Sequence, residues 1–149
     1  MEYEGSAYLF SANSGTGKST HTAFWQKVFG KENTTLINDD KPAVRPKDGV
    51  YCAFGTPFSG KSCMNENVAF PIKALCFIHR SMKNEIKRLS PSESLPLIVE
   101  QTLRPKSEEN IFYLFETLDG FLKNVPVYSL GVTYSPESAL FAYRAINGK

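Results

Sequence analysis

Long apolar runs are missing from this 149-residue sequence, and so is a strong excess of either charge. No stretch reaches the roughly 18 apolar residues of a membrane-spanning helix, and the N-terminus lacks the basic and apolar segments of a signal peptide. The net charge is +2 and the basic residues are scattered, which argues against nucleic acid as a partner. These absences predict a cytoplasmic protein that binds neither membranes nor nucleic acid.

Cysteine is also scarce in this chain. Cys52, Cys63 and Cys76 are odd in number and do not follow the spacing of a metal site. We expect them to be free thiols in a reducing compartment, in agreement with a cytoplasmic location. Hydrophobic residues make up 42% of the chain and charged residues 21%, which is ordinary for a globular protein. Residues 1–149 are therefore expected to form a single domain with one core.

Strand-like and helix-like patterns alternate along the sequence. Apolar runs rich in β-branched and aromatic residues predict buried strands at residues 7–10, 34–37, 50–54, 74–78 and 125–132, with 84–89 as a further candidate. Start signals and apolar spacing predict helices over residues 21–29, from Ser90, from Ser107, and from Ser135 to near Gly148. This alternation predicts an α/β fold, a mixed sheet flanked by helices.

The helix expected after Ser107 has one apolar face. Residues at helical spacing on this face are Ile111, Leu114, Phe115, Leu118 and Leu122. We expect these side chains to lie in the hydrophobic core, without a role in binding a cofactor.

The segment LFSANSGTGKSTHT, residues 9–22, has the pattern of a phosphate-binding loop. It lies between a predicted strand and a predicted helix, the order that lets loop amides and a helix N-terminus face phosphate oxygens. Gly15 and Gly17 permit the backbone angles that such a loop needs. Lys18 would reach the β- and γ-phosphates of ATP, and Ser19 would offer its hydroxyl to Mg²⁺. The predicted nucleotide-binding residues in this segment are Asn13, Ser14, Gly15, Thr16, Gly17, Lys18, Ser19 and Thr20.

The first position of this motif is usually glycine, and here it is Ala12. If φ is negative at this position, alanine fits at little cost. If φ is positive, alanine costs about 1 kcal/mol. The sequence leaves both cases open.

Two adjacent carboxylates, Asp39 and Asp40, follow the apolar run 34–37. Such a pair is costly unless a cation neutralises it, and enzymes with this kind of loop need an acid to hold Mg²⁺. We expect one acid to hold the metal while the other faces the acceptor. The alternative is an exposed turn, because Asn, Asp and Pro in NDDKP favour turns.

The motifs SANSGTGKST, LINDD and FGTPFSGK, in this order, resemble the phosphoenolpyruvate carboxykinase-type P-loop kinases. This group includes ATP-dependent phosphoenolpyruvate carboxykinases and the C-terminal domain of HPr serine kinase/phosphorylases. The resemblance covers roughly residues 7–78 and implies a phosphoenolpyruvate carboxykinase-like fold. It implies that Lys18 binds the transferred phosphate, that Asp40 and Ser19 hold Mg²⁺, and that Asp39 is the base for the acceptor hydroxyl.

Three further residues complete the expected site. Lys61, at the end of FGTPFSGK, is expected to face the phosphates. Arg104 is the first candidate for a cation that stabilises the transition state, and Arg80 is the second. The alternative for either arginine is a solvated surface position. HPr kinases also carry a histidine upstream of the loop, and neither His21 nor His79 matches it.

The leading interpretation is an ATP-dependent kinase, similar to HPr serine kinases, that transfers a phosphoryl group to a hydroxyl. The acceptor would be a serine of a protein or peptide, or a small molecule. Ala12 and the missing histidine leave open a nucleotide-binding module without catalysis. A carboxykinase-like enzyme comes third, because the chain is short for a dicarboxylate pocket. The sequence leaves open whether the chain forms a homo-oligomer and whether it is the C-terminal part of a longer protein.

Overall fold

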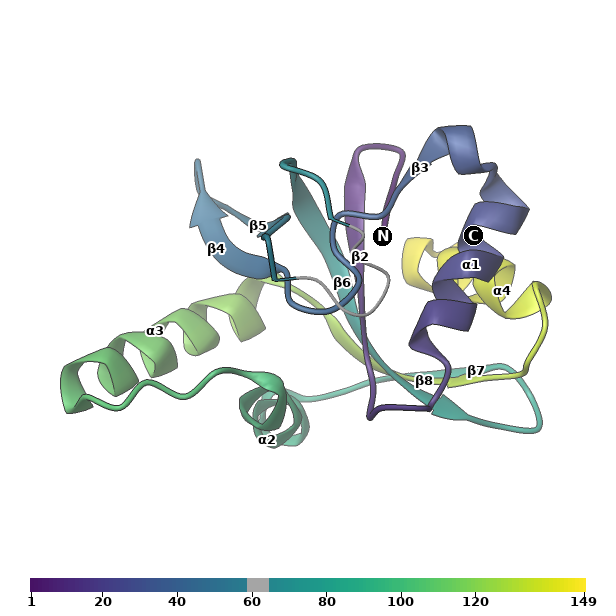
Figure 1. The fold of residues 1–149 in the computed structure, drawn as a ribbon. Coiled ribbons are helices and arrows are strands. Elements are labelled where there is room, and N and C mark those ends of the chain that lie inside the picture. The colour runs from purple at the N-terminus through teal and green to yellow at the C-terminus, as the bar shows by residue number, and fades with distance from the viewer. Residues whose placement is uncertain (59–64) are drawn as a thin grey trace.

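The computed structural model describes residues 1–58 and 65–149, and they form an α/β fold with a mixed sheet flanked by helices (Figure 1). The strands are β1 (Glu2–Tyr3), β2 (Ser6–Ser11), β3 (Thr34–Thr35), β4 (Ala43–Lys47), β5 (Val50–Phe54), β6 (Ala69–Arg80), β7 (Glu85–Arg88) and β8 (Val127–Val132). The helices are α1 (Lys18–Phe29), α2 (Pro91–Gln101), α3 (Glu108–Asn124) and α4 (Glu137–Asn147), with a short 3-10 helix, η1, at Lys31–Asn33. The expected fold class is confirmed at this level.

Strand β6 is the centre of the sheet. Along one side it pairs with β2 in parallel. Along the other side its first residues pair with β5 in antiparallel orientation, and its later residues pair with β8 in parallel. The sheet continues from β2 through β1 to β3, from β5 to β4, and from β8 to β7. Because β2 and β8 both run parallel to β6, their carboxyl ends lie at the same edge of the sheet.

The two faces of the sheet carry separate cores, because successive side chains of a strand point to opposite faces. On one face Ala74, Cys76 and Ile78 of β6 pack in a cluster with residues of α1 and α4, among them Trp25. On the other face Leu75 and Phe77 belong to a cluster with residues of α2 and α3. In Figure 1, α1 and α4 lie together on one side of the sheet and α2 and α3 on the other.

The helix boundaries follow local signals in the sequence. Ser90 caps α2 with a complete capping box: its side chain accepts a hydrogen bond from the Glu93 amide, and the Glu93 side chain accepts one from the Ser90 amide. Pro91 is the first residue of the helix. Ser107 caps α3 by accepting a hydrogen bond from the Asn110 amide. Gly148, in left-handed conformation, ends α4 as expected. None of the helices in the described part of the chain is long and apolar enough to cross a membrane.

The predicted strand at 34–37 is wrong in its second half. Only Thr34 and Thr35 pair with a neighbouring strand. Ile37 lies outside a strand and is 1% exposed, in the cluster under α2 and α3. The apolar side chain anchors a connecting segment in the core. In sequence, such a segment looks like a buried strand.

Strands β4 and β5 form a hairpin, of which the sequence predicts only β5. Its turn is formed by Asp48 and Gly49, which both have positive φ. Strand β4 contains Arg45, Pro46 and Lys47 and is mostly exposed, so it lacks an apolar alternation. Proline and basic residues are typical of an edge strand, where they discourage pairing with another chain.

Helix α3 is only partly buried, which corrects the expectation for its apolar face. Leu118 is 7% exposed, but Ile111 is 38% and Phe115 is 48% exposed. Leu114 and Leu122 pack partly against the core cluster. Figure 1 shows that the N-terminal half of α3 projects sideways beyond the sheet, so its apolar residues have no layer to cover them.

Candidate functional site

The loop between β2 and α1, residues 12–17, is the centre of the candidate site, and we name it the glycine loop. Gly15 has φ of 80° and Gly17 has φ of 116°, both in the region that favours glycine. A Cβ atom built on either residue would meet nothing within 4 Å. Backbone conformation, and not crowding, therefore explains the two glycines, as the sequence predicts.

The N-terminus of α1 opens directly from this loop. Gly17 is its N-cap and has no side chain to accept a hydrogen bond from the first-turn amides. The first amides of a helix lack an intrahelical acceptor, and the helix dipole adds partial positive charge there. The first helical hydrogen bond runs from the His21 amide to the Gly17 carbonyl. This end of α1 is suited to bind an anion.

Lys18 folds back over the glycine loop. Its Nζ donates a hydrogen bond of 2.7 Å to the carbonyl oxygen of Ala12. Inside the loop, the Thr16 amide donates to the Asn13 carbonyl at 3.2 Å and closes a turn. An ammonium group that is held on a backbone carbonyl can exchange that partner for a phosphate oxygen.

Ala12 fits its position without strain. The non-glycine residues with positive φ in the described chain are Glu4 and Asp48, so the case of positive φ at Ala12 does not apply. Ala12 is 8% exposed and belongs to the core cluster between the sheet and α1. Its methyl group replaces the usual glycine hydrogen with buried apolar contact. The other predicted loop residues differ in exposure, with Asn13, Ser14 and Ser19 exposed and Thr20 half-buried.

Arg80 contacts the glycine loop from the end of β6. Its Nη2 donates to the Gly15 carbonyl at 3.0 Å and its Nε donates to the Thr16 carbonyl at 3.3 Å. Arg104, which the sequence ranked first, is exposed in the connection between α2 and α3, the helices of the other face. The structure therefore places the second-ranked arginine against the loop.

Asp39 and Asp40 lie in a turn that Asn38 organises. The Asn38 Oδ1 accepts hydrogen bonds from the amides of Asp40 at 2.8 Å and Lys41 at 2.7 Å. Asp40 is exposed and lies 3.8 Å from the Lys41 ammonium. Asp39 is half-buried in the same turn. The exposed-turn alternative thus describes Asp40, and the metal and base roles of the two acids stay predictions.

The turn at 38–41 is joined to residues 55–58. The Asn38 Nδ2 donates to the Thr56 carbonyl at 3.0 Å, and the Thr56 hydroxyl donates to the Lys41 carbonyl at 2.7 Å. A side chain at Gly55 would collide with the backbone carbonyl of Glu66, so only glycine fits between these segments. Lys61 and Cys63 lie outside the described residues.

His21, in the first turns of α1, is a buried structural residue. The Trp25 Nε1 donates to its Nε2 at 3.1 Å, and its Nδ1 lies 3.3 Å from the Ser138 hydroxyl oxygen. Because the Ser138 hydroxyl donates to the Ser135 carbonyl at 2.7 Å, the Nδ1 carries the proton and donates to Ser138. Burial lowers the pKa of His21 to about 4, so the ring is neutral at pH 7.

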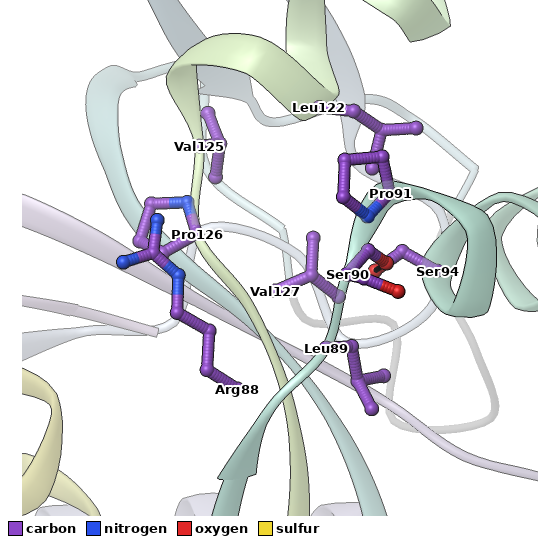
Figure 2. A pocket seen from close by; sticks show the side chains of 9 residues that line it. All are labelled: Arg88, Leu89, Ser90, Pro91, Ser94, Leu122, Val125, Pro126 and Val127. Atoms are coloured by element: carbon purple, nitrogen blue, oxygen red, sulfur yellow. Dashed lines mark hydrogen bonds between the residues drawn. The ribbon is translucent and has the colours of Figure 1, made fainter.

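A cavity of about 330 Å³ lies on the other face of the sheet, where β7, β8, α2 and α3 meet. Figure 2 shows Arg88 beside Pro126 on one side of this cavity, and Ser90 and Ser94 on the other side. The two serines are already used by the N-terminus of α2, where the Ser94 hydroxyl donates to the Ser90 carbonyl. None of the residues that line this cavity belongs to the glycine loop, and its surface is both polar and apolar.

The part of the chain that the structure describes contains no group of three or more His, Cys, Asp and Glu residues that could hold a metal ion. A metal at the glycine loop would therefore depend on hydroxyl, carboxylate and phosphate oxygens together. Comparisons of the chain with family models, with curated proteins and with solved structures found no match.

Proposed function

We propose that the protein binds the phosphates of ATP at the glycine loop and transfers the γ-phosphoryl group to a hydroxyl acceptor. The observation that carries the proposal is the conformation of the loop. Two glycines with positive φ lead into the uncapped N-terminus of α1, and Lys18 is held over the loop on a backbone carbonyl. Backbone amides, a helix dipole and a mobile cation are the groups that bind nucleotide phosphates.

Ser19 and Asp40 offer the hydroxyl and carboxylate oxygens that Mg²⁺ takes as ligands. Ser19 is exposed in the first turn of α1, and Asp40 has an exposed carboxylate. In the proposal Ser19 and Asp40 hold Mg²⁺, and Lys18 binds the transferred phosphate. When bound, the metal neutralises charge on the phosphate oxygens.

Asp39 is the proposed base for the acceptor hydroxyl. The acceptor class that the proposal names is a serine of a protein or peptide, as in HPr serine kinases, to which the sequence motifs are similar. The principal alternative is a module that binds nucleotide without catalysis, and it leaves Asp39 without a chemical role.

Calorimetric titration with MgADP and MgATP tests the binding part of the proposal. Replacing Lys18 by Met should weaken binding by about tenfold or more, because a charge-assisted contact with phosphate is lost. Lys27→Met in the last turn of the same helix is the matched control, since Lys27 is exposed and remote from the loop. Equal affinities of the wild-type and Lys18→Met proteins would refute the proposed site.

Transfer of the γ-phosphate to peptides that contain serine tests the catalytic part. Asp39→Asn should abolish transfer and leave MgADP binding close to that of the wild type, because the amide cannot accept the proton. Binding without transfer in the wild-type protein with every acceptor tested would favour the non-catalytic module. A rate unchanged by Asp39→Asn would show that Asp39 is not the base.

A further inference from the structure

Arg80 reaches the glycine loop because β6 is longer than its neighbour. The parallel pairing of β2 with β6 ends where Ser11 lies opposite Phe77. Strand β6 continues to Arg80, beside the loop that follows β2. Ile78 belongs to the core cluster under α1, and Arg80 is two residues further along the strand, so its side chain lies on the same face. This is the face on which the loop leads into α1.

The base of Arg80 is held in place by the sheet. Arg80 is in register with Val132 of β8, and the next residue, Ser81, donates its amide to the Val132 carbonyl at 3.1 Å. The Asn84 Oδ1 accepts from the Thr133 amide at 2.9 Å and ties the following turn to β8 as well. The guanidinium therefore extends from a fixed strand end, although its own surface is exposed.

The two bonds from Arg80 act on the orientation of loop peptides. In a trans peptide the carbonyl and the following amide point in opposite directions. Arg80 donates to the Gly15 carbonyl, which belongs to the same peptide group as the Thr16 amide. It also donates to the Thr16 carbonyl, which belongs to the same peptide group as the Gly17 amide. The Thr16 amide already closes the turn to Asn13. The Gly17 amide points away from the guanidinium, and none of the described residues accepts a hydrogen bond from it.

We propose that Arg80 is a positioning residue of the glycine loop, which fixes the peptides at residues 15–17 so that the Gly17 amide is oriented for a nucleotide phosphate before the nucleotide arrives. This inference rests on the proposed function. Glycine has more backbone freedom to lose than any other residue, so an external clamp on these peptides reduces the entropy that binding must remove. Arginine suits the role because its planar fork offers several donors and stays protonated.

The test compares Arg80→Ala, Arg80→Lys and the wild type in calorimetric titration with MgADP and with MgATP. We expect Arg80→Ala to weaken both nucleotides equally, by about tenfold, because the loop is shared by both. Arg80→Lys keeps a charged donor but not the planar guanidinium that can donate to both carbonyls. Its loss of nucleotide affinity should therefore be intermediate, about threefold. Arg88→Ala is the matched control, an exposed arginine on β7, the strand that follows β6 in the chain and pairs with β8.

A second measurement follows, without nucleotide, the exchange of the Thr16 backbone amide, which closes the turn to the Asn13 carbonyl and shares a peptide with the Gly15 carbonyl that Arg80 holds. Exchange should be faster in Arg80→Ala and unchanged in Arg88→Ala, while thermal melting stays close to the wild type in both, because Arg80 is exposed. A stability loss that explains the weaker binding would contradict a positioning role. A loss of phosphoryl transfer with unchanged MgADP affinity would also overturn it, since Arg80 would then act on the transferring phosphate.

Failure of the inference and failure of the proposed function give different results. If the wild-type protein binds neither MgADP nor MgATP, the proposed function fails, and amide exchange at Thr16 still shows whether Arg80 holds the loop. If the wild type binds and Arg80→Ala binds equally well, the function stands and the role of Arg80 is refuted. Equal weakening in Arg80→Ala and Arg88→Ala would indicate only a general effect of positive charge and would also refute it.

Discussion

Ala12 shows how one side chain changes the loop motif without disturbing it. Its φ is not positive and its methyl group is buried in the core cluster that includes Trp25. The substitution of the usual glycine therefore adds apolar burial and removes flexibility from the unfolded chain.

Ala12→Gly should lower the free energy of unfolding by about 1–2 kcal/mol, because a buried methyl group is lost and the unfolded chain gains entropy. It should not tighten MgADP binding. Urea unfolding and calorimetric titration check the two parts. Ser14→Gly, at an exposed position of the same loop, is the control that removes no buried methyl group. Tighter nucleotide binding by Ala12→Gly would show that the methyl group distorts the loop.

His21 is the second residue whose environment decides its behaviour. Its two ring nitrogens are both used in the neutral form, one as an acceptor from Trp25 and the other as a donor to Ser138. Protonation would remove the acceptor and place a charge in the core. The pKa of His21 therefore falls to about 4, below the ordinary value of 6.5.

Stability should consequently depend on pH through His21. Above pH 6.5 the ring is neutral in both folded and unfolded chains and has no effect. As the pH falls from 6.5 towards 4, the unfolded chain takes up a proton and the folded chain does not, so stability decreases. The difference in unfolding free energy between pH 7 and pH 5 should be larger in the wild type than in His21→Gln, by about 2 kcal/mol. Parallel pH profiles from urea unfolding would contradict a neutral, buried His21.

At the scale of elements, the start of α2 is determined by its capping box. The Ser90 side chain and the Glu93 side chain satisfy one another's backbone amides. Lys87 of β7 also bonds to Glu93 at 2.6 Å, and these hydrogen bonds lower the pKa of Glu93 to about 2. The cap thus connects the helix to the strand that precedes it.

Ser90→Ala should lower the free energy of unfolding by about 1 kcal/mol, because the Glu93 amide loses its acceptor. Ser90→Thr keeps a hydroxyl and should recover most of the loss. Urea unfolding of both variants checks this. Equal losses in the two variants would show that the cap contributes no stability at this position.

In helix α3, residues on the same apolar face differ in how deeply they are buried. Leu118 is buried in the core cluster on the α3 face of the sheet, whereas Phe115, about one turn earlier, is 48% exposed. Leu118→Ala should cost about 3 kcal/mol through the lost transfer energy and the cavity that remains. Phe115 is already 48% exposed, so Phe115→Ala should lower the free energy of unfolding by less than about half as much as Leu118→Ala. Chemical unfolding of the two variants checks the order, and a larger loss for Phe115→Ala would place this residue in the core after all.

At the scale of the whole molecule, Asn38 connects segments that are far apart in sequence. Its carboxamide bonds to the turn at 40–41 and to Thr56. The Glu66 amide bonds to the Ile37 carbonyl next to it. The position of Asp39 and Asp40 therefore depends on contacts with residues near 56 and 66.

Asn38→Ala should lower the free energy of unfolding by about 2–3 kcal/mol, because the buried Asn38 side chain makes several partly buried hydrogen bonds that are all lost. Asn33→Ala is the matched control, an exposed asparagine whose side chain bonds to the Phe29 carbonyl, and it should cost less than about 1 kcal/mol. Thermal or urea unfolding distinguishes the two. Similar losses would mean that the Asn38 junction adds little to the fold.

The elements with strong local signals were predictable. The strand at 50–54 and the helices that follow Ser90 and Ser107 have the expected starts, because capping and apolar periodicity act within a few residues. The edge strand β4 was missed because its exposed residues carry no apolar alternation. The strand prediction fails at Ile37 because a buried apolar residue of a loop and one of a strand look alike in sequence.

The sequence by itself determined the glycine loop, since a strand, a turn with glycines and a helix start are local features of consecutive residues. Only the tertiary structure decided which distant residues meet that loop. Arg80 lies 64 residues beyond Thr16, and it arrives there because β6 pairs in parallel with β2 and runs past its end. Strand order and register depend on the packing of the whole chain, so the spacing of residues in the sequence does not predict them.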